Sequence, residues 1–63
     1  MEIFETRGKF VLGTERNGTY EIPVRGESFG ARYGRNLDKI NLTGCYVYKT
    51  EAGAKAARKR LSV

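Results

Sequence analysis

Arginine, aromatic and glycine residues are interleaved between Arg25 and Arg35, and these residue types suit the binding of a nucleic-acid strand. Arginine pairs with phosphates, aromatic rings stack on unpaired bases, and glycine lets the backbone approach closely. The candidate contacts in this segment are Arg25, Phe29, Arg32, Tyr33 and Arg35. The alternative is a glycine-kinked strand and loop in which the two aromatic rings fill the core and the arginines lie in water.

A second cluster of cations lies near the C-terminal end of the sequence and consists of Lys55, Arg58, Lys59 and Arg60. Cations at the end of a helix are favoured by the helix dipole alone, so this cluster is weak evidence by itself. If it lies on the same side of the domain as the arginine-glycine segment, the two would form a continuous patch. Such a patch would displace counterions from a phosphate backbone.

The distribution of charge supports a basic C-terminal part. The net charge is +5, but residues 1–24 carry three cations against four carboxylates, whereas residues 25–63 carry nine cations against three carboxylates. A concentrated positive field raises the encounter rate with polyanions or with an acidic protein surface.

Tyr46 and Tyr48 suggest a different kind of surface. They alternate with Cys45 and Val47, so if the latter pair faces inward, both tyrosines face the other way. Tyrosine is enriched at protein interfaces, which makes the pair a candidate protein-binding face. The alternative is that the C-terminal helix and the N-terminal hairpin cover the two faces of this strand.

The sequence offers few parts for catalysis or for a metal site. It contains no histidine, one cysteine and seven carboxylates scattered along the chain, so we expect no enzyme activity, no metal and no cofactor. Cys45 lies in an apolar run and is interpreted as a small buried residue in a reducing compartment. No long apolar stretch or signal-peptide pattern is present, so we expect a soluble, cytoplasmic protein with no membrane partner.

The N-terminal half shows the apolar alternation of strands with one buried and one wet face. Strands are predicted near 9–14 and 19–25, with a turn at 16–18 where Asn-Gly favours positive φ angles. An earlier strand over 2–7 joins them through Gly8. Pro23 lacks an N–H, which places it at an edge or a bulge.

Glycines interrupt the middle of the chain, from residue 26 to 44. A short strand over 28–33 is one interpretation, and residues 36–42 fit either a helical turn or the start of a strand. Residues 46–48 are predicted as a strand because aromatic and β-branched side chains fit a pleated surface.

A C-terminal helix is predicted over 51–61. Thr50 is a good N-cap and Glu51 suits the first turn. The predicted buried side consists of Gly53, Ala54, Ala57 and Leu61.

Together these patterns predict one α+β domain over residues 1–63. It would have a small antiparallel sheet of three to five strands and the C-terminal helix packed on one face. A chain this short buries only about 60 % of its surface, so its stability comes from packing or from homo-oligomerisation.

The favoured function is a small basic, non-enzymatic module that binds single-stranded or duplex nucleic acid, for instance as a regulator of transcription or nucleic-acid metabolism. The alternative is a small inhibitor or adaptor of the kind carried by phages, which docks a strand edge or the tyrosine face onto a larger acidic partner. A structural protein of a ribosome or similar particle is a third hypothesis.

Overall fold

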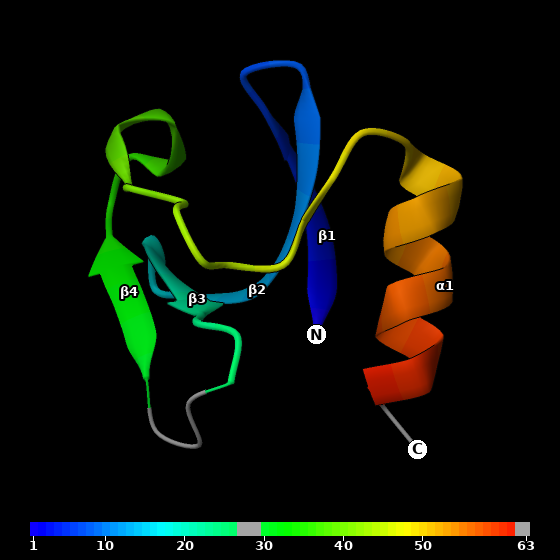
Figure 1. The fold of residues 1–63 in the computed structure, drawn as a ribbon. Helices are drawn as coiled ribbons and strands as arrows, with labels where there is room; N and C mark the ends of the chain where they lie inside the picture. Colours follow the sequence, from blue (N-terminus) through cyan, green and yellow to red (C-terminus); the bar gives the residue numbers. More distant parts are fainter. Residues whose placement is uncertain (27–29, 62–63) are drawn as a thin grey trace.

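The computed structural model describes residues 1–26 and 30–61, in which an antiparallel sheet carries a C-terminal helix (Figure 1). The elements, in chain order, are β1 (Glu2–Thr6), β2 (Lys9–Arg16), β3 (Thr19–Pro23), β4 (Ala31–Gly34), the 3₁₀ turn η1 (Leu37–Lys39), β5 (Val47–Tyr48) and α1 (Glu51–Leu61). Strands β1 to β4 lie side by side in that order, and β5 pairs with β2. The predicted α+β architecture is confirmed, and the helix has the predicted bounds.

Two tight turns with positive φ angles connect the first three strands. Asn17 and Gly18 have φ angles of 53° and 82°, as a two-residue hairpin turn requires, and Arg16 pairs with Thr19 across it. The β1–β2 turn has the same form with Arg7 and Gly8 at 52° and 75°. The two turns predicted from Asn-Gly and from Gly8 are therefore confirmed, and they fix the register of both hairpins.

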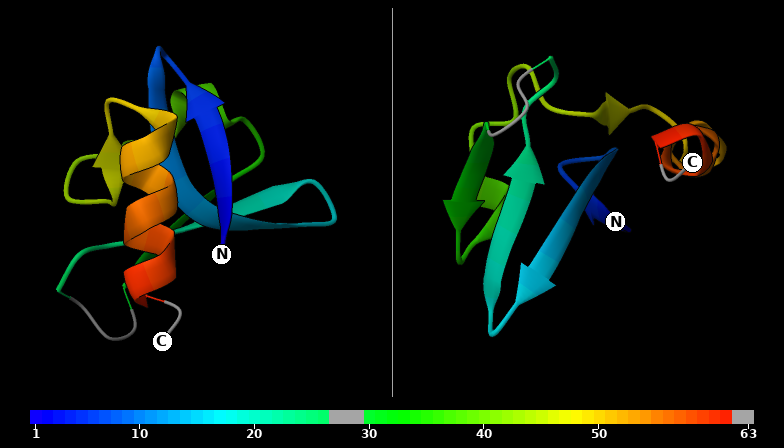
Figure 2. Two further views of the ribbon diagram at one scale, coloured as in Figure 1. Left: turned by 90° about the vertical axis from the view of Figure 1, so that its right-hand side faces the viewer. Right: turned by 90° about the horizontal axis from the view of Figure 1, so that it is seen from below.

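Strand β2 curves strongly and joins two halves of the sheet (Figure 2). Its first half pairs with β1 on one side and β5 on the other, and its second half pairs with β3. The change of partner occurs at the buried Gly13, where an added Cβ would lie 2.5 Å from Ile22 Cδ1 and 2.9 Å from the carbonyl oxygen of Glu21. Strand β3 can approach this closely only because residue 13 has no side chain.

Strand β2 also separates two apolar clusters, one on each of its faces. The first contains the buried residues Val11, Ile22, Ile40 and Cys45, and the second contains Leu12, Ala54 and Ala57. The adjacent residues Val11 and Leu12 are both fully buried. The expectation of one wet face is therefore wrong for the middle of β2. Leu12 lies on the face that was predicted to be buried and is covered by α1, whereas Val11, on the face expected to be wet, is buried against Ile22, Ile40 and Cys45.

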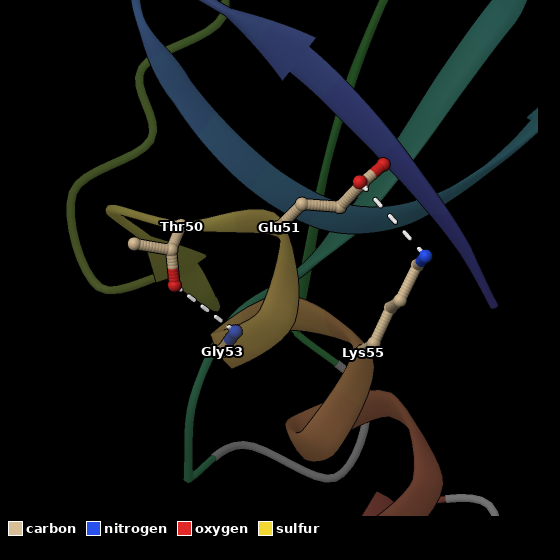
Figure 3. Close-up of polar contacts among 4 residues, drawn as sticks. All are labelled: Thr50, Glu51, Gly53 and Lys55. Atoms are coloured by element: carbon tan, nitrogen blue, oxygen red, sulfur yellow. Dashed lines mark hydrogen bonds and ion pairs between the residues drawn. The ribbon is translucent and has the colours of Figure 1, made fainter.

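The helix α1 contacts β1, β2 and β5. The Thr50 hydroxyl accepts a hydrogen bond from the Gly53 N–H at 3.1 Å, which confirms the predicted N-cap (Figure 3). Ala54 and Ala57 are buried as predicted, and their small side chains let the helix lie close to Leu12. Leu61, predicted on the buried side, is 43 % exposed, because only the earlier turns of the helix contribute buried residues.

The middle of the chain folds as a short edge strand followed by a 3₁₀ turn. Strand β4 pairs with β3, and the Asn36 side chain caps η1 by accepting a hydrogen bond from the Asp38 N–H at 3.1 Å. The predicted strand at 28–33 overlaps β4, although part of that range lies outside the described residues. Pro23 belongs to an interior strand, but the β2–β3 ladder ends at Glu21, so its missing N–H leaves no gap in that ladder.

Candidate nucleic-acid interface

A groove of about 430 Å³ lies between β4 and the residues of η1. It is lined by Arg32, Tyr33, Gly34, Arg35, Asn36, Lys39, Ile40 and Asn41. None of these described residues is a carboxylate, and three of them are cations. The groove is therefore a positively charged hollow with polar amide groups on one wall.

The close approach of η1 to β4 depends on Gly34. A Cβ at this position would lie 2.9 Å from Ile40 Cγ1, so a larger residue would push the segment after η1 away from the strand. Ile40 is itself buried in the Val11 cluster, which anchors the segment from its other side. This packing brings Lys39 to the groove that contains Arg35.

Arg35 and Lys39 are the two groove cations best placed to meet an anion. Both are exposed, and among the described residues neither of them forms an ion pair. Arginine and lysine side chains of this kind keep their charge and their donors for phosphate oxygens. Arg35 was among the residues predicted from the sequence and Lys39 was not, because the turn that brings Lys39 to β4 depends on contacts distant in sequence.

Arg32 is in a different situation from the other two groove cations. Its guanidinium donates a hydrogen bond to the Thr43 carbonyl oxygen at 3.2 Å, and its Nε is buried with no hydrogen-bond partner among the described residues. Arg32 is half-buried. It therefore holds the segment after η1 against β4 and contributes to the groove chiefly through its charge.

Tyr33 stands on the opposite face of β4 from Arg32, because neighbouring residues of a strand alternate between faces. The side chain is 65 % exposed, and its hydroxyl donates a hydrogen bond to Glu21 Oε2 at 3.2 Å. This hydrogen bond and the charge of Glu21 raise the pKa of Tyr33 above its usual value. The ring is thus held at one end and open to solvent, as a stacking surface requires.

Arg25 lies away from this groove, over the rings of Tyr46 and Tyr48. Its guanidinium carbon is 5.1 Å from the centre of the first ring and 5.8 Å from the second, within the range of cation–π attraction. Both tyrosines are half-buried beside the Leu12 cluster under α1. Cys45 and Val47 belong to the other cluster, so the expected alternation along this segment is confirmed.

The tyrosine pair consequently presents less free surface than two projecting side chains would. The Leu12 cluster under α1 and the Arg25 guanidinium cover part of the tyrosine surface, in agreement with the alternative interpretation of a covered face. That these tyrosines bind another protein stays a prediction.

The helix cations form a separate group. Lys55 lies 3.9 Å from Glu51, an exposed pair drawn in Figure 3. Arg58 is half-buried and engaged within the molecule, whereas Lys59 and Arg60 are exposed. Figure 1 shows α1 and β4 on opposite sides of the molecule, with the last turn of α1 and η1 at opposite ends.

The candidate residues are therefore separated in space, with Arg25 over the Tyr46 and Tyr48 rings and apart from the others. Arg32, Tyr33 and Arg35 come together at β4, while the helix cations lie across the sheet. Phe29 lies outside the described residues. Lys39, Asn36 and Asn41 are additions from the structure. The Asn-x-Asp and Asn-x-Thr spacings are typical of turns capped by an asparagine side chain and were the available signal for two of them.

The described residues show no other recognisable chemical centre. No three histidine, cysteine or carboxylate side chains within residues 1–26 and 30–61 gather as metal ligands would. Among the same residues, no helix has the length and apolar character needed to cross a bilayer. Comparison with protein-family models, curated proteins and solved structures found no match to this chain.

Proposed function

We propose that this protein is a small basic, non-enzymatic module that binds nucleic acid through the groove between β4 and η1. The supporting observation is that Arg35 and Lys39 converge on a hollow whose described lining includes no carboxylate. Nucleic-acid affinity is dominated by cations that replace the counterions of the phosphates. Two exposed cations beside a concave surface provide this interaction at a defined place.

The groove residues have different roles in binding. Arg35 and Lys39 contact phosphates, and Tyr33, exposed on the outer face of β4, contacts a base or sugar. Arg32 acts mainly by holding the wall in position through Thr43. The cations of α1 add to the general positive field and raise the encounter rate without defining the site.

The test compares two pairs of substitutions that remove the same charge. Labelled single-stranded and duplex oligonucleotides are titrated at two salt concentrations with the wild type, the R35A/K39A variant and the K59A/R60A variant. We expect R35A/K39A to weaken binding by about 10-fold or more at low salt and to lower the salt slope by about one to two. The helix pair should change affinity by less than about threefold.

Two results would overturn the proposal. One is the absence of binding to either oligonucleotide at low salt. The other is an equal loss from both variants, which would mean that affinity follows net charge and not the groove. Thermal melting of each variant shows whether the fold is intact before its affinity is compared.

One specific observation supports the alternative that this protein binds another protein. Strand β4 ends the order β1-β2-β3-β4, and an extended peptide can add to such a strand edge. Binding of this kind would be stoichiometric and weakly dependent on salt. If oligonucleotides fail to bind, a single acidic partner captured in a one-to-one complex that survives high salt becomes the expected result.

A further inference from the structure

A second hollow adjoins the groove beside β4. It has a volume of about 360 Å³ and lies between the β1–β2 turn and the segment after η1. It is lined by Thr6, Arg7, Lys9, Asn41, Leu42, Thr43 and Val47. Asn41 lines both hollows, so the two meet at this residue. Figure 1 shows η1 and the β1–β2 turn at the same end of the molecule.

The wall between the two hollows is held by hydrogen bonds from both sides. Arg7 donates to the Ile40 carbonyl oxygen at 2.8 Å, and Arg32 donates to the Thr43 carbonyl oxygen at 3.2 Å. Asn41 accepts a hydrogen bond from the Thr43 N–H at 3.0 Å. The surface is therefore formed before any ligand arrives, which lowers the ordering cost of binding.

Positive charge continues from the groove into the second hollow. Lys9 is exposed at the start of β2, and the described lining of this hollow also contains no carboxylate. Asp38 lies nearby, and its carboxylate accepts a hydrogen bond from the buried hydroxyl of Thr6. Lys39 thus lines the first hollow and Lys9 the second, and Asn41 lines both.

We propose that the two hollows form one track for a single strand of nucleic acid, which passes from Lys39 over Asn41 to Lys9. This inference rests on the proposed function and names its substrate class. A single strand is flexible enough to follow two hollows that meet at a small side chain. A duplex has a persistence length of about 150 base pairs, and bending it over a domain of 27 × 26 × 22 Å would be costly. Exposed Tyr33 gives the strand a ring for stacking.

The length of the strand should decide which lysines matter. A strand of about three nucleotides fills one hollow, whereas a strand of about eight nucleotides reaches both, within the range of site sizes known for small single-strand-binding domains. Oligothymidylates of these two lengths are titrated with the wild type and with the K9A, K39A and K59A variants. Lys59 is the control, because it is also an exposed lysine and lies on the last turn of α1.

For the longer strand, we expect K9A and K39A each to weaken binding by about three- to tenfold and to lower the salt slope by about 0.7. The shorter strand occupies one hollow at a time, so the K9A and K39A variants should differ from each other in their affinity for it. The K59A variant should bind both strands nearly as the wild type does. The charge-preserving variant Lys9→Arg should restore the affinity for the longer strand, and the side-chain amide signals of Asn41 should shift on binding.

The outcomes separate this inference from the proposed function. If the K39A variant binds the longer strand more weakly, while the K9A variant binds it as the wild type does and the Asn41 signals do not shift, the track is wrong and the groove alone is the binding site. Tighter binding of a duplex than of the single strand would overturn the substrate class. Failure of both oligothymidylates and a duplex to bind at low salt would overturn the function and the track together.

Discussion

Arg32 on β4 donates a hydrogen bond to the main-chain oxygen of Thr43, 3.2 Å away, and thereby connects the edge of the sheet to the segment that leads into β5. The same side chain lines the candidate groove. It therefore serves the fold and the electrostatics of the site at once. A loss of binding after its removal is informative only when the stability of the variant is known.

The substitution Arg32→Ala should lower the free energy of unfolding by about 1 kcal/mol. A charge-assisted hydrogen bond contributes about 1.5–3 kcal/mol, but partial exposure of this contact and the unpartnered buried Nε reduce the net effect. Urea denaturation of the wild type and the variant measures the difference. Arg35→Ala, at an exposed position three residues along the chain, is the control and should leave stability within about 0.5 kcal/mol. Equal midpoints for all three proteins would refute the structural role of Arg32.

The substitution Gly13→Ala should destabilise the protein by about 1–3 kcal/mol, the usual cost of forcing atoms into a packed site. The new Cβ would meet both a side-chain carbon of Ile22 and the carbonyl oxygen of Glu21, and the main chain cannot move aside as a flexible side chain can. Gly8→Ala is the comparison, because that Cβ meets nothing within 4 Å and the cost comes only from the positive φ angle. Thermal melts should rank Gly13→Ala as the more harmful change, and the reverse order would contradict the close packing of β2 and β3.

The substitution Thr50→Ala should cost about 1 kcal/mol by removing the hydrogen bond to the Gly53 N–H. Thr50→Ser keeps the hydroxyl and should retain most of the stability. Helical circular dichroism and the unfolding midpoint are the two measurements. Because α1 is short and buries mainly alanines, its cap should matter more than the exposed Glu51–Lys55 pair. A larger loss from Lys55→Ala than from Thr50→Ala would show that this ranking is wrong.

Tyr33 should lose its proton at a higher pH than the usual value of 10.0, because its hydroxyl donates to Glu21 and the carboxylate disfavours a second negative charge. A pKa raised in the folded state means that the protonated phenol favours folding. This contribution is complete below the unfolded-state pKa and is lost as the pH rises through the folded-state pKa. Difference spectra of the wild type and Tyr33→Phe follow the ionisation, and Glu21→Gln should bring the pKa of Tyr33 back toward its usual value. An unchanged titration in that variant would exclude the Glu21 contact as the cause.

Much of the fold follows from local patterns in the sequence. Asn17 and Gly18 determine a hairpin because few other residues adopt two successive positive φ angles, and Thr50 determines the start of α1 because its hydroxyl satisfies a free N–H. Such features need only neighbouring residues. The strand and helix positions could therefore be predicted before their partners were known.

The candidate groove could be predicted only in part. Arg35 and Tyr33 were identified from residue type, but the meeting of Lys39 with β4 depends on the contact of Gly34 with Ile40, which no periodicity reveals. Whether the arginine-glycine segment and the helix cations form one continuous patch also depends on the three-dimensional placement of β4 and α1, which lie on opposite sides of the molecule. Alternation along β2 similarly indicates two faces but not that each face has its own apolar cover, as Val11 and Leu12 do.

The central position of β2 has a consequence for how the domain comes apart. This strand bonds to β1, β3 and β5 and gives a fully buried side chain to each apolar cluster. Because both clusters share β2, neither cluster can open to solvent without exposing the other, so local openings that leave half of the molecule intact should be rare. The backbone amides of residues 11–13 should then exchange with solvent deuterium only through global unfolding, and their exchange rates would report the stability of the whole domain.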